Sequence, residues 1–200
     1  MAGVGLTLME PVKLLEFLKF AGKLKALRRT GWVKNGIENP ETVAGHMYRM
    51  GVMSMVINDP QLDMNKCLRM SLVHDLAESI VGDITPHCGV SDEEKHKKET
   101  EAMESLTSLL DPSVGKEVQN LFQEFEAQAT AEAMFVRDLD RFDMILQAFE
   151  YEEAEKRPDF LQEFFSSTVD KFRHPSVREL VTELIKQRAE RASASIGGSV

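Results

Sequence analysis

The chain has 200 residues, a formal net charge of −9 at pH 7, 42% hydrophobic residues and 28% charged residues. These proportions are ordinary for a globular protein and exclude a disordered, collagen-like or low-complexity chain. The acidic charge disfavours binding to a nucleic-acid polymer, and no apolar stretch reaches the roughly 18 residues that a membrane span needs. Two cysteines outside any CxxC pair and the lack of a secretory signal pattern predict an intracellular protein, in the cytoplasm.

Apolar residues at helical spacing predict helices almost throughout, the first over residues 11–27. Turn-forming residues predict a loop that continues to Pro40, where a second helix is expected to start and to run to about Ile57. A third helix is expected from Met64 to Val81. It ends at Gly82, which suits a left-handed helix terminus.

The second half of the sequence continues the helical pattern. Ser91 and Glu94 form a capping-box pattern that predicts a fourth helix, which ends near residue 110. Further helices are expected from residue 112, over residues 130–151, after Pro158 and after Pro175. Because no segment alternates with the period of a strand, the sequence predicts an all-α fold, a single domain of about seven to nine helices over residues 11–190. Flexible termini are expected at residues 1–10 and 191–200.

A set of histidines and carboxylates carries the chemical information in the sequence. His74 and Asp75 lie in an otherwise apolar helix, where two adjacent ionisable groups are costly to bury without partners. Glu78 follows four residues after His74, so the three side chains project from one side of the predicted helix. His46 lies on the inward side of the preceding helix, and Asp140 lies among apolar residues of the sixth.

Imidazole and carboxylate groups together form a ligand set for a divalent ion such as manganese, iron, cobalt, nickel or zinc. Two histidines and two aspartates fill four positions, and an octahedral ion keeps two more for water and a substrate oxygen. Bound water then becomes a nucleophile near neutral pH, and the ion neutralises charge on a phosphoryl group. The structural alternative for each residue alone is a hydrogen-bonded core histidine or a solvated carboxylate. The combination of all four contexts argues against that alternative.

The segments that hold these residues resemble the HD-domain metal-dependent phosphohydrolases, whose pattern is H…HD…D. Within that family, four stretches are similar to the 5′-deoxynucleotidase branch: RRTGWV, ENPETVAGHMYRM, LVHDLAESIVGDITP and EAMFVRDLDRFDMILQA. The resemblance covers roughly residues 14–175. It implies an HD-domain helical bundle, a homodimer, and a divalent metal cation as cofactor, with manganese, cobalt or magnesium expected first.

The resemblance also implies roles for individual residues. Four residues match the metal ligands of the family: His46, His74, Asp75 and Asp140. Glu78 falls on the glutamate of the HDxxE run, with a role as general acid/base or as ligand of a second cation. Asp83 falls on the aspartate of the GD(I/L)xP loop, with a catalytic role that anchors the substrate or assists a second cation.

Two further residues fall near the substrate contacts of the family. Arg29 matches an arginine that binds phosphate, and Trp32 matches a tryptophan that packs against the sugar and disfavours a 2′-hydroxyl. In some relatives these two residues are adjacent, whereas here two residues separate them. Arg28 is therefore the alternative arginine, and a plain core position is the alternative for Trp32.

These observations predict a metal-dependent phosphomonoesterase that hydrolyses deoxyribonucleoside 5′-monophosphates to deoxynucleoside and phosphate by attack of metal-activated water. One alternative is an HD-type phosphohydrolase for another nucleotide, such as a cyclic nucleotide, a triphosphate or guanosine tetraphosphate. Another is a non-catalytic helical module that binds a metal and a partner.

The sequence offers one surface for the implied homodimer, an apolar stripe on the last predicted helix. The stripe consists of Val177, Leu180, Val181, Leu184 and Ile185. The alternative is that it packs within its own subunit. The charged run around His96, EEKHKKE, reads as a solvated helix face.

Overall fold

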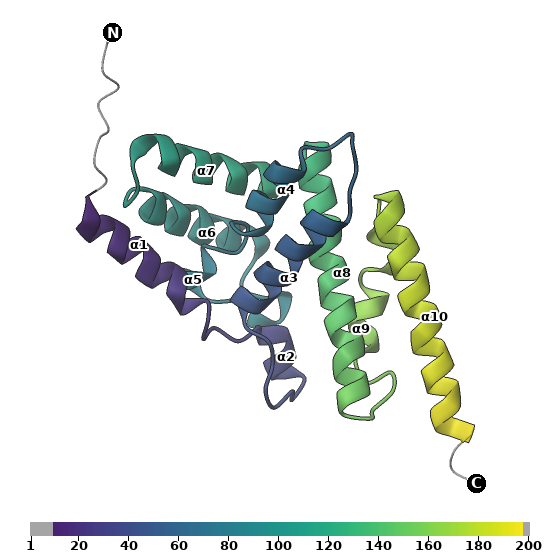
Figure 1. Ribbon diagram of the computed structural model, residues 1–200. Helices are drawn as coiled ribbons and strands as arrows, with labels where there is room; N and C mark the ends of the chain where they lie inside the picture. Colours follow the sequence, from purple (N-terminus) through teal and green to yellow (C-terminus); the bar gives the residue numbers. More distant parts are fainter. Residues whose placement is uncertain (1–9, 198–200) are drawn as a thin grey trace. The chain divides into compact units, whose positions relative to one another are not determined.

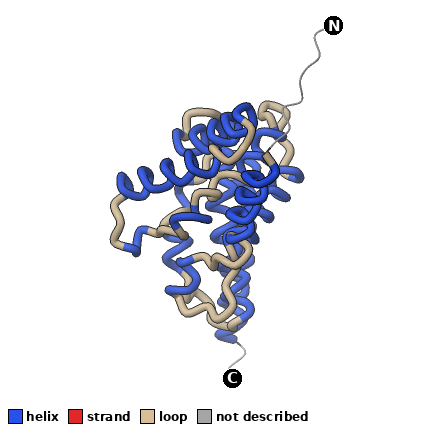
Figure 2. Tube along the Cα trace, turned by 90° about the vertical axis from the view of Figure 1, so that its left-hand side faces the viewer, coloured by secondary structure: helices blue, strands red, loops and turns tan. Residues whose placement is uncertain are grey.

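The computed structural model describes residues 10–197, which form helices and loops without a β-strand (Figure 2). The predicted all-α class is thereby confirmed. The described residues hold ten α-helices, of which three have five residues or fewer (Figure 1), and none is long and apolar enough to cross a membrane. The helices are α1 (Pro11–Lys23), α2 (Thr30–Lys34), α3 (Val43–Val56), α4 (Met64–Ser71), α5 (Glu78–Val81), α6 (Asp92–Thr107), α7 (Pro112–Ala127), α8 (Ala131–Ala154), α9 (Gln162–Ser166) and α10 (Pro175–Gly197). Two 3-10 turns, η1 (Pro86–Cys88) and η2 (Val169–Lys171), complete the order.

The described residues divide into two compact units, which we describe one at a time. The first unit contains residues 10–48 and 72–126, and the second contains residues 49–71 and 127–197. Helix α3 contributes its first turns to one unit and its last turns to the other. The single domain expected over residues 11–190 stays a prediction, and the outermost parts of the expected flexible termini, residues 1–9 and 198–200, lie outside the described range.

The core of the first unit gathers apolar side chains from α3, α6, α7 and the turns beside α1 and α5. Its buried members are Leu24, Val43, Met47, Leu76, Ala77, Ala102, Met103, Leu106 and Phe122. Helices α1 and α6 both pack against α5. The predicted start of α6 is confirmed, because the Ser91 hydroxyl accepts a hydrogen bond from the Glu94 backbone N–H at 3.2 Å.

Helix α3 starts three residues later than the sequence predicts. Before it, Thr42 and Arg28 form an isolated antiparallel bridge, in which the Arg29 N–H donates to the Glu41 carbonyl and the Val43 N–H to the Leu27 carbonyl. Backbone groups engaged in that pairing are unavailable for a helical turn, so the helix begins only after the bridge. The loop expected between the first two long helices also contains the short helix α2.

The prediction of one long helix from Met64 to Val81 is wrong, because α4 ends at Ser71 and α5 begins only at Glu78. The intervening residues form successive turns closed by hydrogen bonds three residues apart, such as Leu76 N–H to the Val73 carbonyl. Apolar periodicity continues through such turns, because a tight turn has nearly the same spacing as an α-helix. His74 and Asp75 therefore lie in a turn.

In the second unit, α4, α9 and α10 pack on the long helix α8. The apolar stripe of α10 is used in this packing, because Val177, Val181 and Leu184 are buried while Leu180 is 40% exposed. The alternative that this stripe packs within its own subunit therefore holds for most of its residues. Helix α10 continues to Gly197, into the segment from residue 191 for which the sequence predicts a flexible tail, and the flexibility of that tail stays a prediction.

Two aspartates on α8 beside Asp140 have structural partners in the second unit. Arg49 donates through Nε to Asp143 Oδ1 at 2.5 Å, and Asp143 is fully buried. Asp138 Oδ2 accepts the backbone N–H groups of Arg173 and His174, each at 2.7 Å. These contacts fasten α3 and the start of α10 to α8.

Candidate functional site

Three of the four predicted metal ligands are brought together in the first unit. His46 Nε2 lies 3.7 Å and His74 Nε2 lies 3.2 Å from the same carboxylate oxygen, Asp75 Oδ2. Both histidines are buried, whereas the Asp75 side chain is 22% exposed and gives the cluster access to solvent. One potential ligand atom from each residue lies within 4.8 Å of the other two, so a single divalent cation fits between them.

Local structure explains how these side chains meet. His46 is held in the first turn of α3, directly after the Arg28–Thr42 bridge, and its backbone N–H donates to the Thr42 carbonyl. His74 and Asp75 are presented by the turn before α5, and the His74 ring packs against Phe125 with 4.9 Å between centroids. The His46 and His74 rings lie edge to face, 5.4 Å apart.

The fourth predicted ligand, Asp140, lies on α8 in the second unit. Arg137 Nη1 lies 3.4 Å from Asp140 Oδ2 in an ion pair one turn along the same helix. The role of Asp140 as a metal ligand stays a prediction.

Glu78 is buried at the first position of α5. Burial raises its pKa well above the ordinary value, and the negative charges of Asp75 and Asp83 raise it further, whereas Arg29 and Lys95 act against the shift. Its Oε2 atom has no hydrogen-bond partner among the described residues. A carboxyl with a raised pKa keeps its proton to a higher pH than usual and can deliver it to a leaving group.

Asp83 follows Gly82, whose positive φ of 78° agrees with the predicted turn after the helix. The Asp83 carboxylate accepts a hydrogen bond at 2.6 Å from the backbone N–H of Thr30, the first residue of α2. The Thr30 hydroxyl in turn donates to the Asp83 carbonyl at 2.8 Å. Asp83 thus fixes the N-terminus of the helix that carries Trp32.

The substrate contacts that the sequence predicts lie around α2. Arg29 is the N-cap residue of this helix, and Trp32 is buried within it. Arg29 lowers the pKa of Glu78, which places its charge near that carboxyl. Arg28 is exposed and donates to the Glu38 carbonyl instead, so the surroundings favour Arg29 over Arg28.

Sequence reasoning missed two residues of α6. Lys95 Nζ lies 3.6 Å from Glu99 Oε1, and Glu99 is buried. Burial acts to lower the pKa of Lys95, but the charges of Glu99 and of the carboxylates at positions 75, 78 and 83 raise it. The signal was available, because Glu99 precedes the buried Met103 by four residues and therefore lies on the inward face of the helix.

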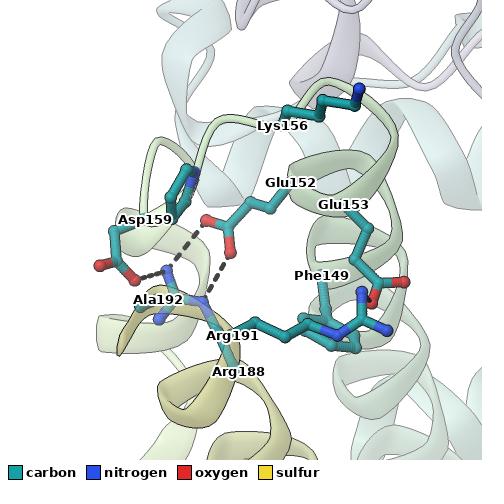
Figure 3. Close-up of a pocket in the computed structure, with 9 residues that line it drawn as sticks. Phe149, Glu152, Glu153, Lys156, Asp159, Arg188, Arg191 and Ala192 are labelled. Atoms are coloured by element: carbon teal, nitrogen blue, oxygen red, sulfur yellow. Dashed lines mark hydrogen bonds and ion pairs between the residues drawn. The ribbon is translucent and has the colours of Figure 1, made fainter. Parts of the chain in front are cut away.

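A cavity of about 380 Å³ lies in the second unit, between the ends of α8 and α10 (Figure 3). Five of its six charged side chains form ion pairs with one another. Arg188 binds the Glu152 carboxylate through two nitrogens, at 2.7 and 2.9 Å, and Asp159 at 2.9 Å, while Arg191 pairs with Glu153. The cavity contains none of the predicted site residues, and its ion pairs join α8 to α10.

Comparison with known proteins relates this geometry to a family. The sequence matches the HD domain family over residues 21–180. It is 50% identical to the 5′-deoxynucleotidase HDDC2 of Xenopus laevis over 188 residues, which cover 94% of each chain. It is also 50% identical to HDDC2 of Homo sapiens, over 91% of this chain and 89% of that one, and 39% identical to the 5′-deoxynucleotidase YGK1 of Saccharomyces cerevisiae, over 87% and 82%.

Solved structures with the same fold include the HD domain-containing protein YGK1, with a TM-score of 0.67 and 29% identity over 90% of this chain and 88% of that one. The PH0347 protein of Pyrococcus horikoshii has a TM-score of 0.69 and 28% identity, over 88% and 99% of the two chains. Both similarities extend over nearly the whole described chain.

Proposed function

We propose that this chain, which belongs to the HD domain family, is a metal-dependent 5′-deoxynucleotidase that hydrolyses deoxyribonucleoside 5′-monophosphates to deoxynucleoside and phosphate. The observation that carries the proposal is the cluster of His46, His74 and Asp75, with ligand atoms within 4.8 Å of one another. The similarity to 5′-deoxynucleotidases at 50% identity over nine-tenths of the chain supports the substrate class.

The residues of the cluster fit a divalent cation, because two imidazoles and a carboxylate are a common donor set for first-row metals. His46, His74 and Asp75 would hold the ion, and Asp140 is the proposed fourth ligand. Manganese, cobalt and magnesium are the proposed ions, and the two imidazole donors favour the first two over magnesium. When bound, such an ion supplies Lewis acidity that lowers the pKa of water and neutralises phosphoryl charge.

Hydrolysis of a phosphomonoester consumes one water molecule. A bond forms between the water oxygen and phosphorus and the water gives up one proton, while the bond from phosphorus to O5′ breaks and O5′ takes up a proton. Glu78 is the proposed proton carrier at Oε2, because this buried carboxyl holds its proton to an unusually high pH. Its alternative role, together with Asp83, is to hold a second cation, which a measured metal stoichiometry distinguishes.

The remaining residues bind and orient the nucleotide. Arg29 is proposed to bind the phosphate, because a guanidinium can donate two parallel hydrogen bonds to phosphate oxygens. Trp32 is proposed to stand beside the sugar and to leave no room for a 2′-hydroxyl. Asp83 keeps both in place through its hydrogen bond to Thr30 and is proposed to contact the substrate as well.

The protein is also proposed to form a homodimer in the cytoplasm. Four apolar side chains recur at helical spacing on α3 with unusually high exposure: Tyr48 at 70%, Val52 at 38%, Met55 at 69% and Val56 at 71%. A contiguous apolar stripe of this kind is typical of a protein interface. Neither Cys67 nor Cys88 is in a disulfide, which agrees with a reducing compartment.

Phosphate release from metal-stripped protein tests the proposed activity. Manganese, cobalt, magnesium or zinc is added back singly, with matched deoxyribonucleoside and ribonucleoside 5′-monophosphates as substrates. We expect metal-dependent release that is faster with the deoxy substrates and is lost in Asp75→Ala together with the bound metal. No release from folded, metal-loaded protein would contradict the proposal and direct the search to cyclic, triphosphate or tetraphosphate nucleotides.

A further inference from the structure

Glu41 of the first unit contacts both residues that are proposed to bind the substrate, Arg29 and Trp32. Its backbone carbonyl accepts the Arg29 N–H at 3.1 Å, next to the Arg28–Thr42 bridge. Backbone pairing therefore fixes Glu41 relative to the start of α2 before any side-chain contact is made.

The Glu41 side chain joins the two proposed substrate contacts through one oxygen atom. Glu41 Oε1 accepts a hydrogen bond from Trp32 Nε1 at 2.9 Å and lies 3.7 Å from Arg29 Nε. The Glu41 and Arg29 side chains are only 13% and 16% exposed, so water screens this pair little. The indole N–H is the single polar group of Trp32, and the hydrogen bond fixes the orientation of the buried ring.

Glu41 also lies beside the candidate metal centre. One of its carboxylate oxygens is within 4.8 Å of a ring nitrogen of His46. A single side chain thus connects a proposed metal ligand, the proposed phosphate contact and the proposed sugar contact. A rigid connection of this kind matters for discrimination between sugars, because a ring that can tilt makes room for one extra hydroxyl.

We propose that Glu41 is a positioning residue that sets the preference for deoxyribose, because it holds the Trp32 ring and the Arg29 guanidinium at fixed positions relative to the metal centre. The inference rests on the proposed function. It assigns to Glu41 no contact with the substrate.

Two substitutions separate the contacts of Glu41. Glu41→Gln keeps an oxygen that can accept from Trp32 Nε1 but removes the negative charge beside Arg29. Glu41→Met has a similar length and removes both. Glu38→Gln is the matched control, because Glu38 lies three residues earlier with an exposed side chain. Circular dichroism establishes that each variant is folded.

Tryptophan fluorescence supplies a readout that does not depend on activity. Trp32 is the only tryptophan in the sequence, so the emission of the protein without substrate or metal reports on this ring alone. We expect wild type, Glu38→Gln and Glu41→Gln to share one emission maximum and one susceptibility to acrylamide quenching. Glu41→Met is expected to differ in both, because the indole N–H loses its partner.

Steady-state kinetics with matched deoxy and ribo substrates complete the test. Glu41→Gln should raise KM for the deoxy substrate about fivefold, the size expected for loss of one ion pair with 3.7 Å between its charged atoms, with the deoxy/ribo ratio of kcat/KM unchanged. Glu41→Met should lower that ratio at least about tenfold, because a buried donor without its partner no longer fixes the ring.

The proposal is overturned if Glu41→Met keeps the wild-type deoxy/ribo ratio, whether or not its emission moves. If Glu41→Met does not fold, a wild-type KM in Glu41→Gln overturns it. Failure of the proposed function gives a different result, because wild type itself then releases no phosphate from any deoxynucleotide. In that case there is no preference for deoxyribose to explain. The emission of Glu41→Met still tests whether Glu41 orients the Trp32 ring.

Discussion

Glu99 lies buried on α6, beside Lys95 and within reach of the negative charges of Glu126 and Asp75. Burial raises its pKa from the ordinary 4.5 to about 7, and the two acids add to the shift while Lys95 acts against it. The folded state therefore binds this proton up to about pH 7, whereas the unfolded chain loses it near 4.5. Between those values the folded state carries more protons, so the contribution of Glu99 to stability falls as the pH rises.

Glu99→Gln removes this titration. We expect the free energy of unfolding of wild type, relative to the variant, to decrease by about 3 kcal/mol between pH 4.5 and 7, with no difference in slope below that window. Urea denaturation of the metal-stripped protein at several pH values measures it. Glu101→Gln, an exposed position on the same helix, is the control, and an identical pH dependence in wild type and Glu99→Gln would refute the assignment.

Lys95 is the second cation, with Arg29, that lowers the pKa of Glu78. Lys95→Met should therefore raise the pKa of Glu78 further and shift the alkaline limb of the pH–rate profile to higher pH. We also expect kcat/KM to fall by at least about tenfold, because the positive charge favours an incoming phosphate. Lys97→Met, whose side chain is 75% exposed, should leave both unchanged. If the pH–rate profile of Lys95→Met is the same as that of wild type, Lys95 does not influence the pKa of Glu78 during catalysis.

At the scale of helices, the sequence predicted where most elements lie but not where they are interrupted. Capping residues such as Ser91 and Thr130 act within one turn, and both predicted starts are present in the structure. The break between α4 and α5 and the formation of α2 depend on distant partners. Asp83, for example, caps α2 from 53 residues away. Local patterns contain no information about such a partner.

The contact between α6 and α7 depends on a glycine. A Cβ atom at Gly115 of α7 would lie 2.6 Å from the Thr107 carbonyl oxygen at the end of α6, and a backbone atom cannot give way cheaply. We expect Gly115→Ala to lower the free energy of unfolding by about 1–3 kcal/mol, although alanine is the better helix former.

Gly22 of α1 provides the control, because a Cβ there would meet nothing within 4 Å. Gly22→Ala should raise the free energy of unfolding by up to about 1 kcal/mol. Urea midpoints of the two variants compare the effects directly. Stabilisation by both substitutions would show that α7 can move away from α6.

At the scale of the whole molecule, the residues of the candidate metal site were easier to predict from the sequence than the surface that would bind a second subunit. His46, His74 and Asp75 could be predicted because a divalent ion restricts the residue types and their order, and these three meet as expected. Lys95 and Glu41 were not predicted, because the side chains that they contact come close to them only in the folded chain. The sequence leaves two roles open for the apolar stripe on α10, a surface for a second subunit or packing within its own, and burial of Val177 and Val181 in the second unit favours the latter.

An exposed apolar face lies on α3, and substitutions in this face test the proposed homodimer. Charged substitution of Met55 or Val56 in an interface would bury a carboxylate without a partner, which is costly. We expect wild type to have twice the 22.6 kDa of one chain in light scattering, and Met55→Glu with Val56→Glu to have the mass of one chain.

Leu180→Glu on α10 is the matched control, because Leu180 is 40% exposed on a helix whose Val177, Val181 and Leu184 are buried. It should keep the wild-type mass. The reverse result, a monomer from Leu180→Glu and a dimer from the α3 variant, would place the interface on α10, whereas a monomeric wild type would refute the homodimer itself. Circular dichroism of each variant separates loss of association from loss of fold, because a monomer that has kept its helices has lost only the interface.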